Sequence, residues 1–130
     1  MMGMLAPDAE AIAALAEEAL AAIPEPLRRH VRGVAIMVDE LADDETLDEL
    51  GIESPYDLTG LYDGIPWGEK ETGTIPARPD TIHLYRQAIL LEWIETGETL
   101  ERLVRNVLIH EIAHHFGFSD AAIERLEREG

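Results

Sequence analysis

Three residues near the carboxyl end, His110, Glu111 and His114, stand in the order His-Glu-x-x-His. Residues four apart on a helix lie one turn apart on the same face, so both imidazoles could bind one zinc ion at about 2.0–2.1 Å. The glutamate between them could then act as general base on a metal-bound water. Two histidines can share a helix without binding a metal, but this spacing favours a Zn²⁺ site.

The residues that follow extend this pattern. Gly117 could end the helix and turn the chain back, because glycine adopts the left-handed conformation without steric cost. That turn could bring Asp120 to the metal as a third ligand and leave the fourth position open for water. Asp120 could instead cap or begin the next helix, unless Ser119 takes the capping role. Glu124 is a less favoured substitute ligand.

A periodic helix expected over residues 99–116 must position these side chains. At about 100° per residue, His110 and His114 fall in the apolar sector of this helix, so we expect both to face the interior. Glu111 lies about 100° from His110, beside the pair. His115 points away from the pair and is not expected to share the metal. The apolar residues of the sector are Leu100, Leu103, Val104, Val107 and Leu108.

Apolar periodicity and turn residues predict the other elements of the chain. Helices are expected at residues 8–22 and 43–50 and from 119 or 120 onward, and strands at 34–38, 57–63 and 81–86. Residues 87–95 are expected to form a short helix or an irregular connection. A stretch rich in proline and glycine separates the last two strands, from Gly64 to Asp80. A loop of this length in a small domain is usually functional or disordered.

Length and composition narrow the possible classes of protein. With 130 residues the chain is expected to form a single domain, 1–130, and with no cysteine it has neither disulfides nor thiolate zinc ligands. The formal net charge of −17 opposes binding to nucleic acid and to anionic membranes. Neither a signal peptide nor a membrane-spanning apolar stretch is visible, so a cytoplasmic protein is expected.

The segment His110–Asp120 resembles the extended motif of the metzincin peptidases, with aspartate in the place of the third ligand. No methionine follows it, so the Met-containing turn of the metzincins is absent. From about Pro24 to Asp120 the chain is more similar to a family of small bacterial zincin-like metallopeptidases. The most specific segments of that similarity are Ile82–Arg86 and Val107–Gly117.

This resemblance implies a fold and a set of site residues. The fold would be a minimal zincin-like α+β domain, with helices packed on a short sheet of about three strands. His110, His114 and Asp120 would bind Zn²⁺, and Glu111 would be the base. In zincins an edge strand beside the active-site helix pairs with extended substrate, and Thr81–Arg86 would be that strand.

Side chains near this site could also contact substrate. We expect His83 and Tyr85 to lie in the substrate-binding region, and these two and Tyr62 are candidate donors to the oxyanion. For each of them, a packed or solvated strand side chain is the more common role.

Three functions fit these observations. The leading hypothesis is a zinc-dependent peptidase acting on peptides or unfolded protein segments. The first alternative is a binding module whose metal is absent or structural and which works with a protein partner. The second is a metal-dependent hydrolase of a non-peptide amide or ester, because the same ligands activate water against any electrophile.

Overall fold

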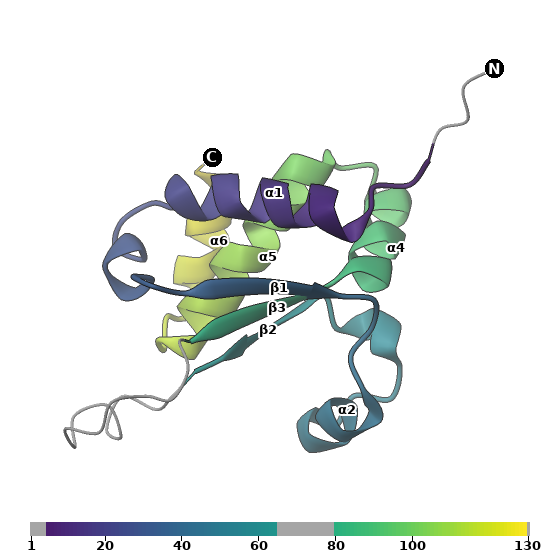
Figure 1. Cartoon of the computed structure of the whole chain (residues 1–130). Helices are drawn as coiled ribbons and strands as arrows, with labels where there is room; N and C mark the ends of the chain where they lie inside the picture. Colours follow the sequence, from purple (N-terminus) through teal and green to yellow (C-terminus); the bar gives the residue numbers. More distant parts are fainter. Residues whose placement is uncertain (1–4, 65–79, 130) are drawn as a thin grey trace.

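Helices packed on a short mixed sheet make up the computed structural model, which describes residues 5–64 and 80–129 (Figure 1). This arrangement confirms the expected α+β fold. Most of the expected loop from Gly64 to Asp80 lies outside the described residues. The elements are α1 (Ala9–Ala21), β1 (Ala35–Asp39), α2 (Asp44–Leu50), β2 (Gly60–Asp63), β3 (Thr81–Tyr85), α4 (Arg86–Thr96), α5 (Leu100–His115) and α6 (Asp120–Arg128), with 3₁₀ turns at Arg28–His30 and Pro55–Asp57.

Polar side chains start the main helices where the sequence predicts. The carboxylate of Asp8 accepts a hydrogen bond from the Ala11 N–H at 2.8 Å, at the start of α1. Asp43 does the same for α2, accepting from the Thr46 N–H at 2.8 Å. These bonds satisfy backbone donors that have no partner within the first helical turn. Short-range sequence signals therefore set the helix boundaries.

The sheet has the strand order β1-β3-β2 within the described residues. Strand β3 pairs in parallel with β1 and antiparallel with β2, so both of its hydrogen-bonding edges are taken. The expectation that Thr81–Arg86 is an edge strand open to substrate is therefore wrong. Strand β2 is the edge strand on the side of α5, and its Gly60 lies against Val107 of that helix.

Helices α1 and α5 cover one face of the sheet, and α6 packs beside α5 (Figure 1). Ile82 and Leu84 of β3 point into this layer and are fully buried there. Side chains alternate between the two faces of a strand, so His83 and Tyr85 belong to the other face. On that face Tyr85 packs with Leu47 of α2 in a smaller apolar cluster.

No helix among the described residues is both long and apolar enough to cross a lipid bilayer.

Candidate metal centre

The two histidines of the motif lie on one exposed stripe near the end of α5. Their ring centroids are 6.1 Å apart and the ring planes are within 7° of parallel. Two imidazoles bound to a single zinc ion stand roughly 5 Å apart, so small side-chain rotations would bring both nitrogens to one ion. Both residues are exposed, and the side chain of His110 is 53% exposed. The expectation that they face the interior is wrong.

The helix keeps the predicted sector, but what covers that sector changes along its axis. Leu103 and Val107 lie in the same sector as His110 and His114. Leu103 and Val107 are each only 6% exposed. Val107 is covered by the close approach of Gly60 on β2. One turn further along, the same sector opens to solvent at the histidines. A helical projection loses the position along the axis, and so it could not show this change.

Glu111 lies between the exposed stripe and the core. Its Cγ would be 3.4 Å from a Cβ built at position 60, and that Cβ would be 2.9 Å from Val107 Cγ1. A side chain at position 60 would therefore push β2 away from α5. Burial raises the pKa of the Glu111 carboxyl from its ordinary 4.5 to about 7. A carboxyl with such a pKa can take up and release a proton near neutral pH.

A groove of about 340 Å³ runs beside these residues. It contains three glutamates and neither lysine nor arginine, so its field favours cationic groups. Residues from α4, α5, α6 and the segment before β2 form its walls. They are Thr59, Glu92, Leu103, Asn106, Val107, His110, Glu111 and Glu127.

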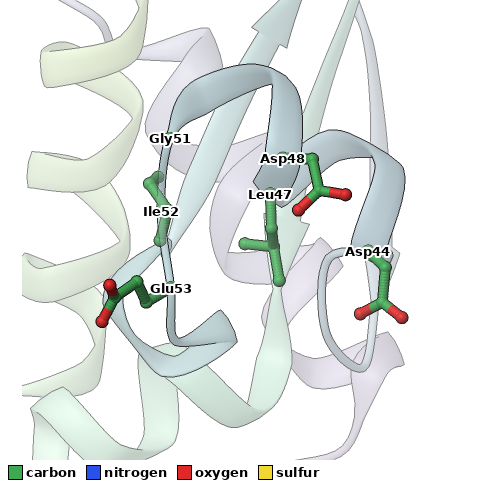
Figure 2. A pocket seen from close by; sticks show the side chains of 6 residues that line it. All are labelled: Asp44, Leu47, Asp48, Gly51, Ile52 and Glu53. Carbon is green, nitrogen blue, oxygen red and sulfur yellow. The ribbon is translucent and has the colours of Figure 1, made fainter.

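A larger hollow of about 550 Å³ lies elsewhere, against α2 and the residues that follow it (Figure 2). The carboxylates of Asp44 and Asp48 lie on one side of Leu47, and that of Glu53 lies on the other (Figure 2). These three groups do not converge on one point (Figure 2), and the lining of the hollow contains neither histidine nor a hydroxyl or thiol side chain. We therefore place the candidate site at the groove on α5.

The chain turns sharply after the motif, as Gly117 predicts. Gly117 has φ of 81°, its N–H donates to the His114 carbonyl at 3.1 Å, and the Phe118 N–H donates to the Ala113 carbonyl at 2.9 Å. These two bonds form a Schellman motif, which satisfies carbonyls at the end of α5. Ser119 then caps α6, because its hydroxyl accepts from the Ala122 N–H at 3.2 Å.

Asp120 is the first residue of α6 and is exposed. Since Ser119 is the cap, the carboxylate of Asp120 has no capping role, and Asp120 is the acidic residue in the first turn of α6, the place that the alternative interpretation gives it. Within the described part of the chain, however, no three His, Asp or Glu side chains are grouped so that they could hold a metal ion. The structure thus brings the two imidazoles together beside Glu111 and leaves Asp120 outside that group. Its role as third ligand stays a prediction.

His83 and Tyr85 occupy the sheet face that carries α2. The Nδ1 of His83 lies 3.7 Å from Asp39 Oδ2, and its Nε2 lies 3.6 Å from Asp63 Oδ2. Tyr85 is 4% exposed, and burial, followed by the nearby Asp39 carboxylate, raises its pKa to about 12. Neither residue lines the groove next to Glu111. After burial and the Asp39 carboxylate, however, the Glu111 carboxylate is also among the charges that raise the pKa of Tyr85. The contact of His83 and Tyr85 with substrate therefore stays a prediction.

Tyr62, which is buried, and His115, which is exposed, form a separate aromatic contact. The two rings stack with centroids 4.0 Å apart, and the Tyr62 hydroxyl donates to Asp80 Oδ2 at 2.8 Å. Burial and that carboxylate raise the pKa of Tyr62 above its ordinary value. The imidazole of His115 is thus engaged away from the His110 and His114 pair, as the helical spacing predicts.

Glu127 is a site residue that the sequence analysis did not identify. Its Oε1 lies 3.6 Å from Nδ1 of His110 and it lines the same groove. Glu127 is one of several glutamates near the carboxyl end, and no local pattern distinguishes it. Only the return of α6 along α5 brings it to the site.

A family model described as zincin-like metallopeptidase matches residues 31–129. The match covers all three strands, the motif on α5 and the whole of α6. No curated protein gives a significant match to the chain.

Proposed function

Because the chain belongs to the zincin-like metallopeptidase family, we propose that it is a zinc-dependent peptidase. In this proposal His110 and His114 bind the metal and Glu111 is the general base. One observation carries it: two near-parallel imidazoles stand on an open stripe of α5 beside a half-buried carboxyl with a pKa of about 7. This combination of nitrogen ligands and an adjacent base is the one that zinc hydrolases need.

The side chains present suit zinc. Imidazole nitrogens with a carboxylate oxygen are common zinc ligands, and we propose Asp120 as the third one. The turn at Gly117 directs the chain back along α5, and Ser119 leaves the Asp120 carboxylate without a capping role. When bound, zinc would lower the pKa of a water molecule and polarise the carbonyl that it attacks.

Glu111 moves the proton in this proposal. Its carboxylate accepts a proton from the attacking water and later donates that proton to the leaving amine. The backbone of Gly60 fixes its position, since the strand passes close to Glu111 Cγ. The residue is thus held at the boundary between β2 and the histidines.

The substrate would bind along β2. Within the described residues β2 pairs with β3 alone, so an extended peptide could add to the outer edge of this strand at Gly60–Tyr62. This strand replaces Thr81–Arg86 as the proposed partner of substrate. The acidic groove beside it would favour peptides with a basic side chain near the bond that is cleaved.

The Glu111→Gln variant tests the proposed mechanism. We expect hydrolysis of an unfolded protein substrate to fall by about 10²- to 10⁴-fold, because the base is lost, while the bound zinc per chain stays the same. A matched control is Glu101→Gln, an exposed residue in the first turn of the same helix, which should leave both unchanged. Undiminished hydrolysis by Glu111→Gln would contradict the mechanism.

One observation favours a second function, that of a binding module with a protein partner. In the described residues the third carboxylate is not assembled with the two imidazoles. If the His110→Ala, His114→Ala double variant captures the same partner as the unaltered chain, this second function is supported. Loss of capture on removal of the metal ligands would contradict the metal-independent form of this second function.

A further inference from the structure

The contact between His110 and Glu127 links the metal motif to the last helix. Glu127 Oε1 lies 3.6 Å from His110 Nδ1, and the Glu127 side chain is only 28% exposed. No such carboxylate contact is found for His114 among the described residues. The two histidines of the motif therefore have different surroundings, although they share one stripe of α5.

Two arginines of α5 hold the end of α6 that carries Glu127. Arg105 donates to the carbonyls of Glu127 at 3.2 Å, Leu126 at 3.3 Å and Glu129 at 3.1 Å. Arg102 donates to the same Glu127 carbonyl at 3.1 Å. The last carbonyls of a helix have no partner within it, and positive charge is favourable at that end. Hydrogen bonds from α5 to Glu127 itself and to residues before and after it thus fix the backbone of Glu127 relative to α5.

Apolar packing against α5 also fixes the end of α6. Leu126 and Ile123 are buried in the main core with Ile109 and Ala113 of α5. Glu127 therefore follows a buried residue and precedes the hydrogen-bonded end of the helix. Its side chain lines the same groove as His110.

A carboxylate next to a metal-binding histidine has a known physical effect. When it accepts a hydrogen bond from one ring N–H, the other ring nitrogen is left without a proton and can bind the metal. The ring orientation is fixed by the same bond. Losing such a partner typically weakens metal binding by about 10- to 100-fold.

We propose that Glu127 is a positioning residue, which accepts from the Nδ1–H of His110 and so presents Nε2 of that ring to the metal. The inference rests on the proposed zinc site. At 3.6 Å the two atoms are farther apart than a hydrogen bond of about 2.7–3.2 Å, and rotation of the part-exposed Glu127 side chain would close the difference. Such bonds often shorten when a site is filled.

The first test compares zinc affinity among variants by competition with a chelating dye. Glu127→Leu keeps the helix propensity but removes the acceptor, so we expect zinc affinity to fall by about 10- to 100-fold. Glu127→Gln keeps a carbonyl acceptor and should recover part of that loss. Glu129→Leu, at the exposed end of the same helix, is the matched control and should change affinity little. Equal affinities for Glu127→Leu and the unaltered chain would overturn the inference.

The second test uses the metal-free protein and needs no activity. Long-range ¹H–¹⁵N NMR spectra, recorded where the imidazoles are neutral, report which ring nitrogen of His110 carries the proton. We expect Nδ1–H in the unaltered chain and a shift toward Nε2–H in Glu127→Leu, with the signals of His114 unchanged. An unchanged His110 tautomer in Glu127→Leu would overturn the inference.

The two tests separate this inference from the proposed function. If the unaltered chain binds no zinc, the zinc peptidase proposal fails, whereas the tautomer of His110 in the metal-free protein still reports on Glu127. If zinc binds equally to the unaltered chain and to Glu127→Leu, the metal site stands and the role of Glu127 is refuted.

Discussion

Two stripes of side chains run along the last turns of α5, one buried in the core and the other exposed to solvent. Leu108, Ile109 and Ile112 are completely buried between the sheet and the neighbouring helices. His110 and His114 are exposed on the groove. Near its carboxyl end the helix thus separates its contribution to folding from its contribution to the site by direction, whereas one turn earlier Leu103 and Val107 are buried in the sector of the histidines. Substitutions on the two stripes should therefore have separable effects.

Glu111 is the exception, because it belongs to neither stripe completely. It lies against Gly60 with its carboxyl partly buried, and that burial raises its pKa to about 7. Partial burial of an acid opposes its ionisation. The raised pKa of Glu111, which is useful for catalysis, therefore lowers the stability of the metal-free protein where the carboxyl is ionised.

The largest expected difference separates Ile112→Ala from His114→Ala. Ile112→Ala should lower the free energy of unfolding by about 2–5 kcal/mol, because it opens a cavity in the core. His114→Ala should change it by about 0.5 kcal/mol or less, because the residue is exposed. Urea unfolding of both variants with chelator present measures the difference. Similar losses in the two variants would refute the separation of the stripes.

Glu111→Gln should stabilise the metal-free protein at alkaline pH by up to about 3 kcal/mol. Folding raises the pKa of the Glu111 carboxyl, because burial disfavours its charged form. The contribution of Glu111 to the stability of the folded state is therefore fully present below about pH 4.5 and is lost as pH rises through about 7. Glutamine does not ionise, and the variant should lose no stability over that range. Urea unfolding at pH 4.5 and pH 8, with chelator, tests this. A gain that is equal at both pH values would show that burial of the charge is not the cause.

The smallest expected effect concerns the charge of the groove. Glu92 lines it from α4, so Glu92→Gln should lower the preference for basic over neutral peptides by at most about 5-fold, the range of an exposed ion pair. The ratio of kcat/KM for two such peptides, at low and high salt, measures it. Glu95→Gln, exposed on the same helix but outside the groove, is the control. Identical ratios for all three proteins would argue against a role of groove charge.

Local signals in the sequence predicted most of the fold. The helices expected at 8–22 and 99–116 are found at Ala9–Ala21 and Leu100–His115, because Asp8 and Thr99 cap them and apolar periodicity sets their length. The turn after α5 followed from the single residue Gly117. These features depend on neighbours within a few residues, which a sequence displays directly.

Long-range relations were beyond such signals. The alternation in Thr81–Tyr85 predicted a strand but could not place it between β1 and β2. A clue was available: Ile82 and Tyr85 are apolar on opposite faces, as is usual for a strand covered on both sides. For Glu127, no clue of this kind existed, since its contact with His110 depends on the return of α6.

The most direct test of the zinc site is the metal content of the chain after exhaustive dialysis against limiting zinc. The unaltered protein should retain about one zinc per chain. His110→Ala should retain none, and its metal-free form should unfold at the same urea concentration as the unaltered chain, because His110 lies on the exposed stripe. Equal zinc content in the two proteins, or none in either, would contradict the assignment of this stripe as the metal site.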